Sequence, residues 1–314
     1  MLKYDKYKNK GLTGLSNVGN TCYINSCMQI LSNTYELNEL LDNIKRDKIN
    51  DNNDGILIKE WDDLRKMMWQ NNCTIAPVRF VKIIQKISLQ KDRLDFSGFE
   101  QNDVSEFLLF VIDCFHNGLK REVDMNISGN IKNELDELAL DCYKMMQNMY
   151  KKEYSEILNI FYGISITQIK SYESNDILSR TYEPFSILTL SLPNKNVTDI
   201  FECLDIYGSD EELTGDNAWQ NDKTNRKEDV KKNIIFWSLP RILIIDLKRF
   251  NNANKKIHTM VNTPINDVDF SKYVKGYNAN DYIYDLFGTG NHSGNVDGGH
   301  YTANIKNSNG KWYN

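Results

Sequence analysis

Apolar residues in the first half of the chain recur at spacings of three and four, which is the period of one face of an α-helix. This spacing predicts helices over residues 22–34, 57–70, 103–119 and about 131–154. Polar segments rich in Asn and Asp, such as residues 47–55, separate these stretches and are typical of surface loops. We therefore expect the first half of the protein to be largely helical.

After about Ile160 the hydrophobic pattern changes to a period of two, with many β-branched residues. Residues 186–192 alternate and stop at Pro193, as a half-buried strand does. The same pattern predicts further strands over residues 234–239, 241–250, 282–288, 301–306 and 311–313. Helices followed by strands imply an α+β fold with a largely antiparallel sheet. Because no internal repeat or low-complexity linker divides the chain, we expect residues 1–314 to form a single domain.

Composition and charge narrow the classes of function. The chain has 38 Lys and Arg against 43 Asp and Glu, a formal net charge of −5, which disfavours nucleic acid as a partner. The N-terminus lacks the apolar core of a signal peptide. The apolar run at residues 242–245 is broken by Asp246, far short of the roughly 20 residues that span a bilayer. We expect an intracellular monomer, cytoplasmic or nuclear, without a membrane partner.

The cysteines and histidines do not form a metal-binding pattern. Six cysteines are too sparse for a disulfide scaffold, and no two of them are two or three residues apart. None of the four histidines forms an H-x-x-x-H pair with another. The sequence therefore predicts no metal site and no cofactor.

Two short segments carry the residues of a nucleophilic site. Cys22 falls at the first turn of a predicted helix, where unpaired N–H groups and the helix dipole favour a thiolate, and Asn17 is an amide that could donate to an oxyanion. His300 is the best candidate base, and Gly298 and Gly299 before it permit close approach of a substrate backbone. Taken singly, a cysteine is most often a small buried hydrophobe and a histidine a core or surface residue, so both readings stay open.

Together these segments resemble the cysteine and histidine boxes of the ubiquitin-specific proteases, papain-like cysteine peptidases that remove ubiquitin. Residues 14–26 read GLSNVGNTCYINS, and residues 298–303 read GGHYTA and are followed by GKWY at 310–313. Residues 100–108 are similar to the acidic motif of the family. The palm and finger strands of the family have counterparts at residues 183–185, 188–192, 213–217 and 239–250. The resemblance covers nearly the whole chain.

The resemblance implies both a fold and an activity. The fold has a helical thumb at about residues 1–125, a helical connection at about 126–158, and at about 159–314 extended β fingers with an antiparallel β palm. The activity is that of a thiol-dependent hydrolase that cleaves the isopeptide or peptide bond after the C-terminal glycine of ubiquitin. Its partners would be ubiquitin and ubiquitinated proteins. Two alternatives remain: a protease for another ubiquitin-like modifier, and a catalytically weak or inactive ubiquitin-binding module.

Carried over to this sequence, the resemblance makes Cys22 the nucleophile, His300 the general base and Asn17 the side-chain donor of the oxyanion hole. Asp103 would help to bind the arginines of the ubiquitin tail, although an acid at a helix N-terminus that offsets the dipole is an equally good reading. His292 would line the cleft as part of a binding loop, next to Gly298 and Gly299.

The sequence departs from the family pattern at two places. Many members bind a structural zinc through two C-x-x-C pairs, which should fall near residues 167–171 and 220–223, but neither segment contains a cysteine. We therefore expect metal-free fingers. The Asp or Asn that orients the histidine should come a few residues after Trp312, whereas Asn314 is one or two positions early. Either the domain continues past residue 314, or another group orients His300.

Overall fold

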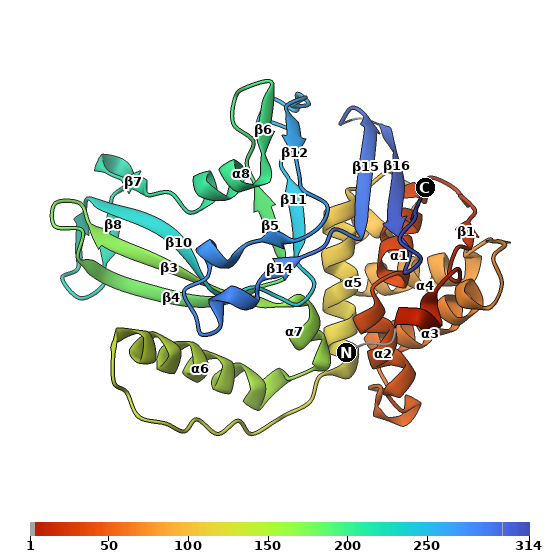
Figure 1. The fold of residues 1–314 in the computed structure, drawn as a ribbon, viewed down its shortest axis with the longest axis horizontal. Helices are drawn as coiled ribbons and strands as arrows, with labels where there is room; N and C mark the ends of the chain where they lie inside the picture. The colour runs from red at the N-terminus through yellow and green to blue at the C-terminus, as the bar shows by residue number, and fades with distance from the viewer. Residues whose placement is uncertain (1–3, 297) are drawn as a thin grey trace.

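Five helices build the first part of the protein. The computed structural model describes residues 4–296 and 298–314, and Figure 1 shows these helices gathered on one side of the molecule. They are α1 (Cys22–Ser32), α2 (Tyr35–Asn43), α3 (Asn53–Gln70), α4 (Val78–Gln90) and α5 (Val104–Leu119). Two short parallel strands, β1 (Gly14–Leu15) and β2 (Thr74–Ile75), join the segment before α1 to the segment before α4.

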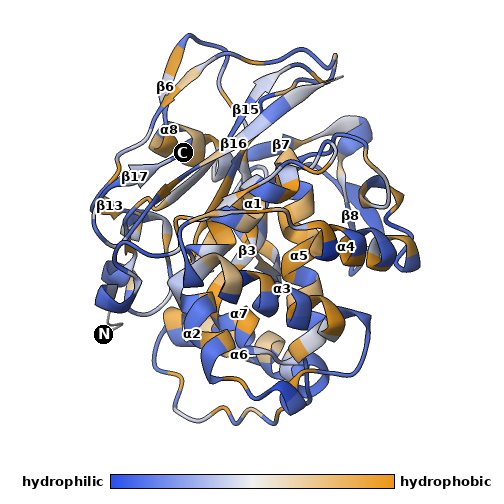
Figure 2. Ribbon diagram, turned by 90° about the vertical axis from the view of Figure 1, so that its right-hand side faces the viewer, coloured by the Kyte–Doolittle hydropathy of each residue, from blue (hydrophilic) through white to orange (hydrophobic). Residues whose placement is uncertain are grey.

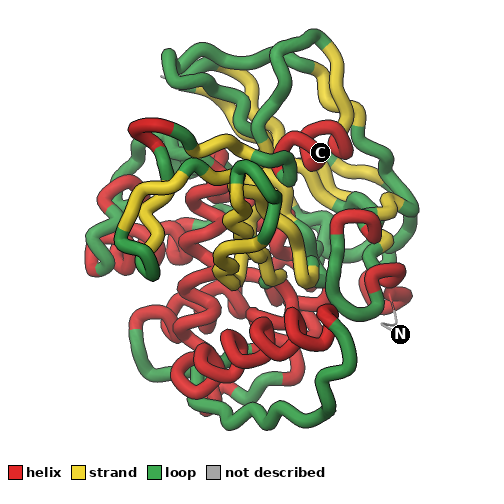
Figure 3. Tube along the Cα trace, turned by 90° about the vertical axis from the view of Figure 1, so that its left-hand side faces the viewer, coloured by secondary structure: helices red, strands yellow, loops and turns green. Residues whose placement is uncertain are grey.

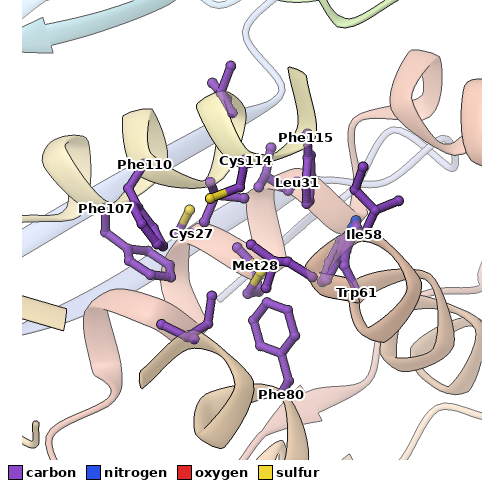
Figure 4. Packing of buried hydrophobic residues seen from close by; sticks show 14 of the residues in the cluster. Cys27, Met28, Leu31, Ile58, Trp61, Phe80, Phe107, Phe110, Cys114 and Phe115 are labelled. Carbon is purple, nitrogen blue, oxygen red and sulfur yellow. The ribbon is translucent and has the colours of Figure 1, made fainter. Parts of the chain in front are cut away.

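The core of this helical half fixes the position of α1. Helix α3 packs against α4 and α5, and α5 also packs against α1. Figure 2 shows hydrophobic and hydrophilic residues mixed along α3, α4 and α6, as expected for helices that bury one face. Figure 4 shows the buried side chains that meet between these helices, among them Met28, Leu31, Trp61, Phe80, Phe107 and Phe115. Burying each such side chain contributes about 1.5–3 kcal/mol, so α1 is held rigidly.

A four-stranded antiparallel sheet projects away from the helical half, with strand order β4-β3-β10-β7. Its strands are β3 (Gly163–Ser171), β4 (Ile177–Phe185), β7 (Glu211–Leu213) and β10 (Val230–Ser238), and the hairpin of β8 (Trp219–Asn221) and β9 (Arg226–Glu228) extends it. Helix α6 (Glu134–Glu153) lies along one side of this sheet (Figures 1 and 3) and buries Leu138 and Cys142 against Ile166 and Trp237. The short helix α7 (Glu156–Phe161) leads from α6 into β3.

The remaining strands form small sheets next to the helical half. Strand β5 (Ile187–Leu190) pairs with β11 (Ile244–Leu247), and β6 (Val197–Asp199) pairs with β12 (Met260–Asn262), both in parallel. Helix α8 (Ile200–Tyr207) follows β6, and β13 (Val268–Asp269) pairs antiparallel with β14 (Ile283–Tyr284). Short 3₁₀ helices lie at Tyr4–Tyr7, Arg46–Lys48, Leu94–Phe96, Gly215–Asn217, Ser271–Tyr273 and Ala279–Asp281.

The last sheet brings the C-terminal part of the chain back to the first helix. Strands β15 (Gly288–Gly294), β16 (Gly299–Lys306) and β17 (Trp312–Tyr313) pair antiparallel in that order. Strand β16 packs against α1, and Figure 1 shows both beside each other. Residues almost 300 positions apart in the sequence therefore meet at the junction of the helices and the strands.

The α+β class predicted from the sequence is confirmed, but four helices and the parallel direction of three strand pairs were not predicted. Helices α2, α4, α7 and α8 were missed; α4 is rich in Val and Ile, which lower helix propensity and blur the helical period. The parallel pair β5–β11 departs from the expected antiparallel palm. Parallel strands need a long crossover, here residues 191–243, and alternation along one strand does not reveal its direction. Within the described residues, no helix has the length and apolar character needed to cross a bilayer.

Candidate active site

Cys22 opens α1 directly after a tight turn. The side-chain oxygen of Asn17 accepts hydrogen bonds from the backbone N–H of Thr21 at 2.9 Å and of Gly19 at 3.2 Å. Gly19 and Asn20 have φ of 116° and 51°, in the left-handed region that lets the chain reverse before the helix. The turn therefore places Cys22 at the first position of α1, at the positive end of the helix dipole.

The same hydrogen bonds orient the Asn17 amide. Because Oδ1 is held against the turn, the Nδ2 group is the free end of the side chain, and it makes no hydrogen bond to any described residue. Asn17 and Cys22 line the same cavity. An amide N–H and the backbone N–H at a helix start are suitable donors for a developing oxyanion.

This cavity has a volume of about 330 Å³ and also contains His300, the first exposed position of β16. Cys22 itself is only 6% exposed, so a substrate must reach it through this opening. The structure thus brings together the three residues that the sequence predicted as nucleophile, base and oxyanion donor. Asn314 lines the cavity as well, but its side chain donates to Asn304 at 2.7 Å. No described residue forms a hydrogen bond with the His300 imidazole.

Asp103 lies outside this cavity, at the start of α5. Its Oδ1 accepts hydrogen bonds from the backbone N–H of Ser105 at 2.8 Å and of Glu106 at 3.1 Å, so it is the N-cap of the helix. Its Oδ2 accepts from the hydroxyl of Tyr301 at 3.3 Å, and burial together with the Asp103 charge raises the pKa of that tyrosine. The carboxylate therefore connects α5 to the residue that follows His300.

His292 also lies outside the cavity, on β15 opposite Tyr301, with the two ring centres 4.7 Å apart. Its Nδ1 lies 3.1 Å from the ammonium of Lys256. Burial lowers the pKa of His292, and the Lys256 charge adds to this shift. A side chain at Gly299 would collide with Nε2 of His292, so the ring and this glycine are packed together. Gly298 is adjacent, facing the side chain of Gln101.

All six cysteines lie within the described residues, and Cys22 is the one that begins a helix. Burial raises the pKa of Cys27, Cys114 and Cys203, and it raises that of Cys142 to about 12. Cys73 is exposed and does not line the cavity. Cys22 is therefore the cysteine whose surroundings suit nucleophilic chemistry.

Comparison with known proteins decides the family. A profile of the family described as ubiquitin carboxyl-terminal hydrolase matches residues 13–314. The chain belongs to the ubiquitin carboxyl-terminal hydrolase family. Human ubiquitin carboxyl-terminal hydrolase 2 is 30% identical over 97% of this chain and 51% of its own length. The Gallus gallus ubiquitin carboxyl-terminal hydrolase 2 is 31% identical over 95% of this chain and 84% of its own length.

The chain spans about half the length of the human and bovine relatives and about a third of Drosophila melanogaster Usp2. Among solved structures, the SAGA deubiquitinating module Ubp8/Sgf11/Sus1/Sgf73 bound to ubiquitin aldehyde matches with a TM-score of 0.71 at 22% identity, covering 98% of this chain and 64% of that one. The same module bound to monoubiquitin matches with a TM-score of 0.70 at 20% identity, over 98% of this chain and 64% of that one. The α+β papain-like fold is therefore shared.

Three further residues of this ubiquitin carboxyl-terminal hydrolase lie near the site and were not predicted from the sequence to be functional. Gln101 Oε1 accepts a hydrogen bond from the backbone N–H of Gly299 at 2.6 Å. Asp246 lies half-buried on β11, where burial raises its pKa and the charge of Asp103 adds to the shift. Lys256 contacts His292. Signals existed for two of them: Asp246 interrupts the apolar run of a strand, and Gln101 belongs to the acidic motif at residues 100–108. Lys256 stands in a polar segment without a distinguishing pattern.

The two segments where the resemblance would place zinc ligands lie in different strands. Residues 167–171 form the end of β3, and residues 220–223 belong to the β8–β9 hairpin. Among the described residues, no group of three or more His, Cys, Asp and Glu side chains could hold a metal ion. That the fingers contain no metal remains a prediction for experiment.

Proposed function

We propose that this protein is a cysteine-dependent deubiquitinase that hydrolyses the bond after the C-terminal glycine of ubiquitin. The observation that carries the proposal is the single cavity that holds Cys22 at the start of α1, His300 on β16 and the free amide end of Asn17. Membership of the ubiquitin carboxyl-terminal hydrolase family supports it. Ubp8, which has a similar fold, has been solved with ubiquitin aldehyde, an electrophile-bearing ubiquitin.

In the proposed reaction the thiolate of Cys22 attacks the carbonyl carbon of the terminal glycine. The oxyanion that forms accepts hydrogen bonds from Asn17 Nδ2 and from the Cys22 backbone N–H. His300 accepts the thiol proton and gives it to the leaving amine, so the C–N bond breaks and a thioester remains. His300 then activates water, which attacks the thioester and releases ubiquitin and the free thiol.

The acidic residues beside the cavity suit the basic tail of ubiquitin. Asp103 lies close enough to Asp246 that its charge adds to burial in raising the pKa of Asp246. A guanidinium would relieve this repulsion and form charge-assisted hydrogen bonds with both carboxylates. We assign them, with Gly298, Gly299 and His292, to binding of the tail that leads to the scissile bond.

A ubiquitin with a C-terminal electrophile tests the proposal. We expect it to form a covalent adduct, which mass spectrometry should map to Cys22. Cys22→Ala should abolish the adduct, and Cys73→Ala, which removes an exposed cysteine that does not line the cavity, should leave it unchanged. An adduct on another residue, or none on the full-length protein, would contradict the assignment.

Two other functions would give different results in the same assay. A protease for another ubiquitin-like modifier would react faster with that modifier in a panel of tail-activated probes. A binding module would retain ubiquitin without releasing product. The cavity favours hydrolysis over binding alone, because a binding surface has no chemical need for a cysteine at a helix start beside a histidine and an amide.

The proposal also covers the partners, the oligomeric state, the location and the subdivision of the protein. Ubiquitin and ubiquitinated proteins would be its partners, and a single chain would act as a monomer in the cytoplasm or nucleus. We also retain the three-part division into a helical thumb at about residues 1–125, a connection at about 126–158, and fingers with a palm at about 159–314. It is supported by helices α1–α5, by α6, and by the projecting sheet.

A further inference from the structure

Lys256 connects the segment between β11 and β12 to β15, the strand that pairs with the one carrying His300. It lies in the segment between β11 and β12 and is half-buried there. Its ammonium lies 3.1 Å from Nδ1 of His292 and donates to the carbonyl oxygens of His292 at 3.0 Å and of Gly294 at 3.2 Å. An ammonium has three N–H donors, so all three have an acceptor on β15.

His292, which Lys256 holds in place, in turn contacts the neighbouring strand β16. It pairs with Tyr301 in the β15–β16 register, and its ring occupies the space that a side chain at residue 299 would need. The path of the backbone immediately before His300 is therefore set by where the His292 ring lies. On the opposite side the backbone N–H of Gly299 is held by Gln101. The start of β16 is therefore held by two contacts, one with Gln101 and one with the His292 ring, and Lys256 supports the second.

We propose that Lys256 is a positioning residue for the reaction: through His292 it fixes the β15–β16 hairpin so that His300 faces Cys22. This inference rests on the proposed function. The contact needs an acceptor at Nδ1, so His292 must be neutral with its proton on Nε2. Lys256 touches none of the reacting groups, and its effect is transmitted by the ring and by Gly299.

The contact has a defined pH dependence. The charged groups that face His292 are Lys256, which lowers its pKa, and Asp103, which raises it, while burial lowers it most. Tyr301 and Phe250 pack against the ring as neutral groups. Because the folded protein disfavours the charged imidazole, the contact is complete above the ordinary histidine pKa of about 6.5 and is lost as the pH falls below it.

The test compares Lys256→Met, which keeps the length of the side chain but removes the donors, with Lys255→Met at the exposed neighbour. We expect Lys256→Met to lower kcat/KM on a ubiquitin substrate by roughly ten- to a hundredfold, mainly through kcat, because a small misplacement of a catalytic group has effects of that size. Lys255→Met should stay within about twofold of wild type. Lys256→Arg should recover part of the loss, since it restores donors. Unchanged kinetics for Lys256→Met would overturn the proposal.

A second measurement is independent of ubiquitin. NMR titration of the His292 imidazole should give a pKa that is higher in Lys256→Met than in wild type, because the variant lacks the neighbouring cation. The same pKa in both proteins would contradict the contact even if hydrolysis fell. If wild type hydrolysed no ubiquitin substrate, the proposed function would fail, while the titration would still decide whether Lys256 holds His292.

Discussion

The two oxygens of the Asp103 carboxylate have different partners, which makes its two possible roles separable. Oδ1 caps α5 through the N–H groups of Ser105 and Glu106, and Oδ2 has the Tyr301 hydroxyl, at 3.3 Å, as its one partner among the described residues. Asn is as good an N-cap as Asp but carries no charge. Substitution by Asn and by Ala therefore distinguishes a capping role from binding of an arginine.

For Asp103→Asn we expect an unchanged melting temperature and a KM for the ubiquitin substrate that rises roughly tenfold, since a hydrogen bond to a charged group is lost. For Asp103→Ala we expect the same kinetic effect and in addition a loss of about 1 kcal/mol in the free energy of unfolding, because the cap is removed. Steady-state kinetics and urea denaturation measure the two effects. If Asp103→Asn left KM unchanged, Asp103 would be a structural cap alone.

Among individual residues, the sequence predicted those reactive side chains that stand in a recognisable local motif. A cysteine after a Gly-Asn-Thr turn and a histidine after two glycines can be recognised in one dimension, and the structure places both in one cavity. Lys256 could not be found this way, and the acidic motif at residues 100–108 did not indicate the role of Gln101. Their importance comes from contacts with residues 198 and 36 positions away, which only the folded chain brings together.

At the scale of elements, the β8–β9 hairpin is closed by a network around Asn221. The buried Asn221 donates to Glu228 at 2.9 Å and accepts from the backbone N–H groups of Lys223 and Thr224 at 2.9 and 3.4 Å. The Thr224 hydroxyl also donates to Glu228, at 2.7 Å. A two-stranded hairpin is marginal by itself, so these hydrogen bonds help to hold it closed.

We predict that Asn221→Ala opens this hairpin, at a local cost of about 1–3 kcal/mol from the backbone donors left without an acceptor. Hydrogen exchange should speed up over residues 219–228 and remain unchanged in α6. Asp222→Ala, an exposed residue in the same turn, is the matched control.

The prediction that the fingers bind no metal has its own test. Chelation should leave the melting temperature of the wild-type protein unchanged, whereas one tightly bound zinc per chain would contradict the prediction.

Strong periodicity predicted α1, α3, α5 and α6 close to their observed bounds, because each buries one clear face. The elements that were missed depend on their surroundings. Helix α4 forms despite its β-branched residues, since Phe80, Ile84 and Ile87 are buried in the helical core. The parallel pairing of β5 with β11 depends on the long crossover between them.

At the scale of the whole molecule, the proposed site lies at the edge of the helical core. Cys22 begins α1, whose residues Tyr23, Ile24 and Met28 are buried in that core. His300 stands on β16, which comes from the far end of the chain and packs its Tyr301 against the same core. The alignment of the pair therefore depends on how firmly the β15–β16 hairpin is held against the helices.

The tip of that hairpin is joined to the helical half by two solvent-exposed hydrogen bonds, Gly299 to Gln101 and Tyr301 to Asp103. Exposed bonds are cheap to break, so we expect the tip to open before the cores unfold. In a urea titration, the midpoint for loss of hydrolysis of a ubiquitin substrate should lie roughly 1 M below the midpoint for loss of far-UV circular dichroism. The reason is that an opening that costs some 1–2 kcal/mol less than global unfolding occurs at a correspondingly lower urea concentration. Gln101→Leu should widen this gap, whereas Gln85→Leu, which loses only a bond to the carbonyl of Gly98, should not. If activity and ellipticity fell together in wild type, Gln101→Leu and Gln85→Leu, the site would be as stable as the rest of the fold.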